Sequence, residues 1–172
     1  MQEQNSRKIL SIILIIGMLI SLFLLYEHLS SSAVKFCTFG KHFDCGIVNK
    51  SPYANLDGIF YLLTIDFNLN LPLLNISDIN LFFDILTSNA FLGFLTLLLI
   101  YVLNKNHNKK VLWIKKEDNR EWTLGILTFS VLYGAGYLFA IQHFILKTYC
   151  LFCILLDITL IVALIIAIKI KH

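Results

Sequence analysis

The sequence predicts an all-α integral membrane protein, built as a bundle of four transmembrane helices. Of its 172 residues, 58% are hydrophobic and only 15% are charged, and the mean hydropathy is +0.76. Long apolar runs separated by polar segments are typical of helices in lipid and exclude an ordinary water-soluble domain. Because four spans fill a chain of this length, we expect one membrane domain over residues 1–172, without an appended soluble domain.

The first apolar run covers residues 9–29 and follows the basic pair Arg7-Lys8. A cleaved signal peptide would share this pattern, but Tyr26-Glu27-His28-Leu29 is a poor cleavage site, so we expect a retained span. Each of the later runs is long enough to cross a bilayer core of about 30 Å. The other predicted spans are residues 83–103, 122–146 and 150–168.

Two polar segments connect the spans, a long loop over residues 30–82 and a basic connector over residues 104–121. Within the loop, residues 58–74 are apolar but interrupted by acidic, amide and proline residues, which are costly in a lipid-exposed span. We therefore expect a short helix lying on the membrane surface. A five-span alternative would place the basic connector outside and separate the two cysteine pairs, so we reject it.

The basic residues indicate the orientation. With four spans, the N-terminus, the basic connector and the C-terminus share one side of the membrane, and that side holds most of the Lys and Arg residues. The positive-inside rule then places both termini in the cytoplasm. The long loop and the start of the last span face the opposite compartment, extracytoplasmic or ER-lumenal, where conditions are oxidising.

All four cysteines fall on this outer side. Cys37 and Cys45 lie in the long loop, and Cys150 and Cys153 open the last span. Residues three apart share one face of a helix, and the N–H groups and dipole at a helix N-terminus favour the thiolate, which is the reacting species in disulfide exchange. The sequence thus places a candidate redox pair at the outer end of the last membrane span.

Several roles for the cysteines remain open. Structural disulfides could brace the loop of a non-catalytic four-span protein. A zinc site is disfavoured because the cysteine spacings do not match paired metal ligands and no histidine stands beside Cys150, so we expect no metal. In the third interpretation, one pair exchanges disulfides with an external protein and the other passes two electrons to a lipid-soluble acceptor, most simply a quinone. We expect no nucleic-acid partner.

The order of these residues resembles the vitamin K epoxide reductase family over most of the chain, from about Ile9 to Ile168. Another four-span family, the bacterial quinone reductases that recharge periplasmic thiol oxidases, carries its C-x-x-C pair in the first outer loop instead. The matching features are Cys37-x7-Cys45, Ser51, Tyr53-Ala54, Gly58-Ile59, Ser88-Asn89, Gly93 and Cys150-x-x-Cys153.

The resemblance implies a role for each cysteine. Cys150 and Cys153 would be the active-site pair. Cys153 would meet a quinone of the menaquinone, ubiquinone or vitamin K type as a thiolate, whose charge the helix N-terminus would stabilise. Cys37 would exchange with the partner protein and Cys45 would attack Cys150. The resting disulfide, Cys37–Cys45 or Cys45–Cys150, stays open.

The implied activity is that of a quinone-linked thiol–disulfide oxidoreductase that supports disulfide bond formation. It would oxidise a thioredoxin-like protein and reduce a membrane quinone. Many microbial members carry a fused thioredoxin-like domain, and this sequence shows none, so we expect the partner to be a separate protein.

Three further residues are candidates for a quinone pocket beneath the cysteine loop. Ser51 resembles the family's loop hydroxyl, Asn89 resembles a polar group that hydrogen-bonds a quinone oxygen, and Tyr149 stands beside the thiols. Each also has an ordinary explanation. Ser51 could be a turn residue before Pro52, Asn89 could form a hydrogen bond between helices, and Tyr149 could be an aromatic residue at the membrane interface.

Asp157 is a departure from the pattern, because vertebrate members carry a tyrosine at this position. An acid one turn below Cys153 would have to be protonated, paired, or part of proton delivery to the quinone. We include it among the quinone-site candidates. Because of this departure, a vitamin K quinone or epoxide reductase is the second interpretation. His28 and His143 are expected to be packed or interfacial residues.

Overall fold

The computed structural model describes most of the chain, and within this part the protein is almost entirely helical, which confirms an all-α membrane protein. Cys37 and residues 67–74 of the expected surface helix lie outside the described residues. The described residues are 2–30, 38–39, 42–66, 76–107, 110–111, 114–115 and 118–170.

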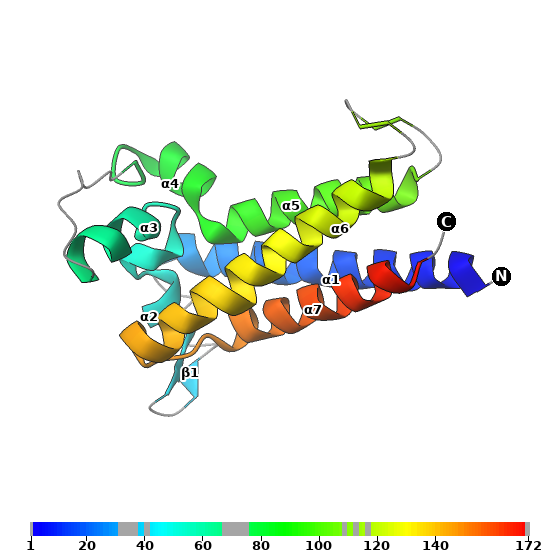
Figure 1. The fold of residues 1–172 in the computed structure, drawn as a ribbon. Helices are drawn as coiled ribbons and strands as arrows, with labels where there is room; N and C mark the ends of the chain where they lie inside the picture. Colours follow the sequence, from blue (N-terminus) through cyan, green and yellow to red (C-terminus); the bar gives the residue numbers. More distant parts are fainter. Residues whose placement is uncertain are drawn as a thin grey trace.

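Three helices are long and apolar enough to cross a membrane (Figure 1). A fourth apolar helix, α5 (Asn89–Lys105), has 17 residues and runs beside them. Helix α1 packs against both α5 and α7, and α6 packs against the same two helices. The three long helices are α1 (Gln2–Leu29), the continuous run of α6 (Asn119–Val131), η5 (Leu132–Leu138) and η6 (Ile141–Leu146), and α7 (Leu151–Lys169).

The expected single helix over residues 83–103 is corrected by the structure. It is interrupted at Ser88, whose backbone is extended, so that α4 (Leu81–Thr87) ends and α5 begins there. The side chain of Ser88 accepts a hydrogen bond from the backbone N–H of Phe91 at 3.2 Å. A serine in this position caps the start of a helix and competes with helical continuation through the same residue.

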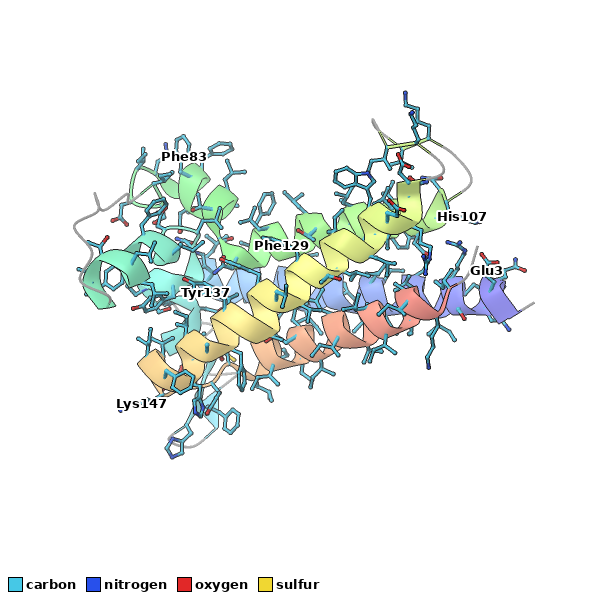
Figure 2. All side chains as sticks on the ribbon, viewed as in Figure 1. Glu3, Phe83, His107, Phe129, Tyr137 and Lys147 are labelled. Carbon is cyan, nitrogen blue, oxygen red and sulfur yellow. The ribbon has the colours of Figure 1, made fainter. Side chains whose placement is uncertain are left out.

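The interior of the bundle is apolar, and so is much of its outside. Leu19, Phe129 and Ile158 each expose more than half of their side chains, as expected for helices that face lipid. Figure 2 shows Phe129 along the bundle between its two ends, which are marked by Glu3 and Lys147. The buried core cluster is Leu10, Leu14, Leu97, Ile100, Leu127, Leu160, Ala163, Ala167 and Ile170.

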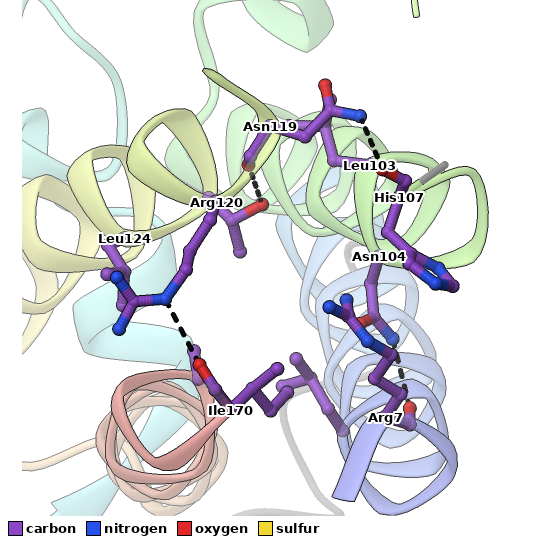
Figure 3. Close-up of a pocket in the computed structure, with 11 residues that line it drawn as sticks. Arg7, Leu103, Asn104, His107, Asn119, Arg120, Leu124 and Ile170 are labelled. Carbon is purple, nitrogen blue, oxygen red and sulfur yellow. Dashed lines mark hydrogen bonds between the residues drawn. The ribbon is translucent and has the colours of Figure 1, made fainter. Parts of the chain in front are cut away.

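Polar side chains tie the helices together at the end where α1 begins and α7 ends (Figure 3). The side-chain amide of Asn104 donates to the carbonyl of Arg7 at 3.0 Å. The guanidinium of Arg120 donates to the carbonyl of Ile170 at 3.1 Å, which satisfies a carbonyl at the C-terminal end of α7. These residues surround a small cavity of about 30 Å³.

The short elements gather at the opposite end of the bundle (Figure 1). Of the segment expected to form a short helix over residues 58–74, the first nine residues are helical, as α3 and η3. A side chain at Gly58 would place its Cβ 2.5 Å from the Cα of Tyr53, so only glycine fits this close approach. The elements are β1 (Thr38–Phe39), β2 (Phe43–Asp44), α2 (Cys45–Asn49), η2 (Pro52–Ala54), α3 (Gly58–Tyr61) and η3 (Leu62–Asp66).

Candidate functional site

The turn before α7 holds the cysteine loop against the start of that helix. Lys147 adopts a left-handed conformation, with φ 51° and ψ 26°, and ends the preceding helix. The strand β2 then pairs with Tyr149, whose carbonyl accepts from Asp44 N–H at 3.0 Å and whose N–H donates to the carbonyl of His42 at 2.8 Å. This pairing brings Cys45 and Cys150 into one buried cluster, in which both are 0% exposed.

The sulfur of Cys150 caps α7. The Sγ atom accepts a hydrogen bond from the backbone N–H of Cys153 at 3.2 Å. The backbone N–H of Cys150 donates to Oε1 of the buried Gln142 at 2.8 Å. The sequence led us to expect the helix N-terminus to act on the Cys153 sulfur, but the cap is Cys150, because the helix begins one residue later than expected. Cys150 and Cys153 carry free thiols, whereas Cys45 is disulfide-bonded. A Cys45–Cys150 disulfide is therefore not the one present in this state.

A cavity of about 620 Å³ lies below the loop, between the helices. Cys153 opens onto it from α7, and four of the residues expected at a quinone site lie in its wall, namely Ser51, Asn89, Cys153 and Asp157. Most other lining residues are apolar. They include Leu24 of α1, Leu92 of α5, Leu138 of η5 and Leu156 of α7. This size and lining are typical of sites for small apolar ligands oriented by a few polar groups.

Asn89 is hydrogen-bonded through both ends of its side chain. Its Nδ2 donates to the carbonyl of Tyr53 at 2.8 Å, and its Oδ1 accepts from the hydroxyl of Tyr133 at 2.9 Å. Ser51 donates its hydroxyl proton to the carbonyl of Val48 at 2.7 Å, so its oxygen keeps only acceptor capacity towards the cavity. Because one amide hydrogen of Asn89 is not used by Tyr53, Asn89 retains a donor.

A sequence model of the vitamin K epoxide reductase family matches residues 8–168, nearly the whole chain. The chain belongs to this family. A comparison with curated proteins gives no match. Membership makes this protein a membrane oxidoreductase of a family that acts with quinones in disulfide or epoxide chemistry.

Asp157, which departs from the vertebrate pattern of the family, lies in the cavity wall close to Gly134. A Cβ on Gly134 would stand 2.5 Å from the Oδ1 of Asp157, so the glycine makes room for the carboxyl group. The carboxyl group makes no hydrogen bond with the residues that the structure describes, which leaves its oxygens available to the cavity.

Tyr149 is not brought to the cavity. Its hydroxyl lies 2.7 Å from Nδ1 of His143, and its ring packs against Phe43 and Phe139 with centroid distances of 5.8 and 6.0 Å. It therefore belongs to an aromatic cluster outside the cavity wall, where it holds β2 against the start of α7. His143 is an exposed member of the same cluster.

Residue patterns alone missed Tyr133 and Asn49. Tyr133 stacks between Phe129 and Tyr137, at centroid distances of 6.3 and 5.3 Å, and all three aromatic residues line the cavity. Their spacing of four residues was a usable signal, because it places them on one helix face. Asn49 gave no comparable signal, since its burial depends on how α2 packs against α1 and α7.

His28 lies in the cavity wall and connects three elements. Its Nδ1 is 2.6 Å from the carbonyl of Asn49 in α2, and its Nε2 is 3.0 Å from Oδ1 of Asp84 in α4. It is thus a packed polar residue, as its sequence context indicates. Within the part of the chain that the structure describes, no group of three His, Cys, Asp or Glu side chains could hold a metal ion.

Proposed function

We propose that this protein passes two electrons from a separate thioredoxin-like protein to a membrane quinone and thereby supports disulfide bond formation. One observation carries the proposal: Cys150 is buried in a cluster with Cys45, while Cys153 of the same pair lines the large apolar cavity. The two thiols therefore face different partners, a loop cysteine on one side and a hydrophobic ligand on the other.

The output step uses the thiol pair of α7. Oxidation of Cys150 and Cys153 to a disulfide releases two electrons and two protons, and a quinone in the cavity takes up both. The cavity volume of about 620 Å³ fits a quinone ring with the first part of a tail. Asn89 would donate a hydrogen bond to a quinone oxygen, and Tyr133 holds the Asn89 amide in place.

The input step uses the loop cysteines. We propose that the partner's dithiol reduces a Cys37–Cys45 disulfide and becomes a disulfide itself, after which Cys45 attacks Cys150 and regenerates a reduced pair in α7. Each exchange breaks one disulfide and forms another, so electrons are conserved. The backbone pairing between β2 and Tyr149 supports this order, because it holds Cys45 beside the start of α7.

We further propose that α5 is the fourth span and that both termini are cytoplasmic. At about 1.5 Å per residue, its 17 residues extend over about 25 Å, close to the hydrocarbon thickness of about 30 Å. The cysteine loop and the cavity mouth then lie on the extracytoplasmic or lumenal side. The basic connector supports this orientation.

Reduction of a vitamin K quinone or its epoxide is the second candidate, because both activities belong to the family. The choice between them depends on the chemistry that Asp157 supplies in the cavity. Assaying a simple quinone and an epoxide side by side would separate the two.

The test is quinone reduction by purified protein in detergent. With dithiothreitol as donor, Cys153→Ala should abolish turnover, whereas Cys37→Ala should retain it, because a small thiol can reduce the α7 pair directly. With a thioredoxin-like protein as donor, Cys37→Ala should lose turnover as well. Wild-type rates in Cys153→Ala would rule out the assigned active site and favour structural disulfides.

A further inference from the structure

Glu27 is an acid buried near the C-terminal end of α1 that the redox chemistry described so far does not use. It is 2% exposed. Its Oε2 accepts a hydrogen bond from Nδ2 of Asn49 at 3.2 Å, and its Oε1 is buried without a hydrogen-bond partner in the described part of the chain. A buried carboxylate with one unsatisfied oxygen is costly, which makes Glu27 a candidate for a role in the site.

Glu27 fixes the orientation of the Asn49 side chain. A carboxylate only accepts hydrogen bonds, so the NH₂ end of the Asn49 amide must face Glu27 and the carbonyl end must face away. That carbonyl end points to the sulfur of Cys153, with 3.9 Å between Oδ1 and Sγ. The backbone of Asn49 is held independently by His28, whose Nδ1 lies 2.6 Å from its carbonyl oxygen.

The two active-site sulfurs consequently have opposite hydrogen-bonding roles. Cys150 Sγ accepts the N–H of Cys153 at 3.2 Å. Cys153 Sγ faces an acceptor oxygen, to which a thiol can donate its proton but with which a thiolate has no favourable contact. The surroundings of Cys153 thus favour the S–H form in this reduced pair.

We propose that Glu27 is a positioning residue that acts through Asn49 to hold Cys153 as a protonated thiol while the α7 pair is reduced. The inference rests on the proposed function, in which Cys153 is the thiol that faces the quinone. In the reduced pair, Cys153 therefore carries a proton. The sequence had instead predicted a Cys153 thiolate stabilised by the N-terminus of the helix. Glu27 thereby lowers the reactivity of Cys153 towards electrophiles, because the thiolate is the reacting species.

Other ionisable groups that the structure describes lie near Glu27, Asn49 and Cys153 but do not hydrogen-bond the side-chain amide of Asn49. Asp157 lies one turn further along α7 and lines the cavity, and Asp44 caps α2 by accepting the N–H of Ile47 at 3.1 Å. On the far side of Asn49, His28 faces Asp84 of α4 at 3.0 Å. Among the described residues, Glu27 is the carboxylate that hydrogen-bonds the Asn49 amide.

The first test measures how fast iodoacetamide alkylates Cys153 in the reduced protein, without quinone, with the modified cysteine identified by mass spectrometry. Glu27→Gln keeps the size of the side chain and removes its charge, so that Asn49 is free to turn its NH₂ group towards the sulfur. Hydrogen bonds to charged groups are among the stronger ones, so we expect alkylation about 3- to 10-fold faster than in wild type. An unchanged or slower rate would overturn the proposal.

A double mutant separates action through Asn49 from a direct effect of charge. In an Asn49→Leu background, Glu27→Gln should leave the alkylation rate within about twofold, because the connecting amide is gone. If the acceleration persists at full size, Glu27 acts through space and the proposed connection is wrong. Ser21→Ala is the matched control on α1: it removes a buried hydroxyl that forms no hydrogen bond within the described part of the chain, so it cannot orient Asn49 and should not alter the rate.

A spectroscopic measurement on the wild-type protein keeps the proposal testable if the Glu27 variants do not fold. Infrared difference spectra of reduced wild type and Cys153→Ser should show an S–H stretching band that the variant lacks. Absence of that band at neutral pH would overturn the proposal. Neither readout uses quinone. A wild-type protein that fails to reduce quinone would reject the proposed function, whereas the alkylation rates and the S–H band decide separately whether Glu27 and Asn49 keep Cys153 protonated.

Discussion

Cys150 and Cys153 are three residues apart but occupy different environments. Cys150 is buried beneath the cysteine loop and caps α7, whereas Cys153 lies in the wall of the cavity. The spacing and order of the four cysteines predict a redox pair at these two positions, and both carry free thiols in the structure. The sequence could not indicate which sulfur caps the helix, because this depends on the left-handed turn at Lys147, a residue without the usual glycine or asparagine signature.

Asn89 offers a residue-scale test of the quinone site. Asn89→Leu removes the donor proposed for a quinone oxygen, so we expect the KM for quinone to rise about tenfold, since one hydrogen bond to a ligand typically has this effect. Tyr133→Phe deletes only the hydroxyl that holds the Asn89 amide and should raise KM by a smaller factor. Steady-state kinetics with a saturating thiol donor would measure both, and an unchanged KM in Asn89→Leu would contradict the assignment.

At the scale of the element, the long apolar helices were predictable and the short capping elements were not. The spans over residues 9–29, 122–146 and 150–168 correspond to α1, the run from α6 to η6, and α7, because uninterrupted apolar sequence in lipid leaves the backbone few alternatives to a helix. The interruption at Ser88 depends on a single side-chain hydrogen bond. The strand pairing of β2 with Tyr149 joins residues far apart in sequence.

Gly134 of η5 lies against Asp157 of α7, and replacing this glycine tests whether the position of the carboxyl group matters. Gly134→Ala would place a methyl group 2.5 Å from Oδ1 of Asp157, so the carboxyl group must move. If Asp157 takes part in proton delivery, quinone reduction should fall about tenfold or more while the protein stays folded.

Gly136→Ala is the matched control, because its Cβ would meet nothing within 4 Å. Turnover and thermal unfolding in detergent should both stay close to wild type in this variant. Equal turnover in the two alanine variants would show that the position of Asp157 does not matter for the reaction.

The whole molecule is a bundle with two dissimilar ends. At the end where α1 begins, hydrogen bonds from the side chains of Asn104 and Arg120 join the helices. At the other end, the cysteine loop lies above the cavity. The order of spans and polar segments predicted two such ends, because it places the termini at one end of the bundle and the cysteines at the other. The cavity was expected only from the family resemblance, because its wall combines faces of α1, α5, α6 and α7 that are far apart in the chain.

The proposed orientation can be tested by labelling in intact cells with a membrane-impermeant maleimide. A cysteine at the exposed position Ile79, in the segment before α4, should be labelled directly. Lys110→Cys, in the basic connector, should be labelled only after the membrane is permeabilised. The reverse pattern would place the cysteine loop in the cytoplasm and contradict the account of its oxidising environment.

The central claim is that the α7 thiol pair delivers its two electrons to a quinone. The most direct measurement is a single turnover under anaerobic conditions. Protein with a reduced α7 pair and the Cys45 disulfide intact, the state that the structure shows, is mixed with one equivalent of quinone, and both products are counted. The account predicts one quinol for each new disulfide, with that disulfide mapped by mass spectrometry to Cys150 and Cys153. Quinol formed without this disulfide, or no quinol at all, would contradict it.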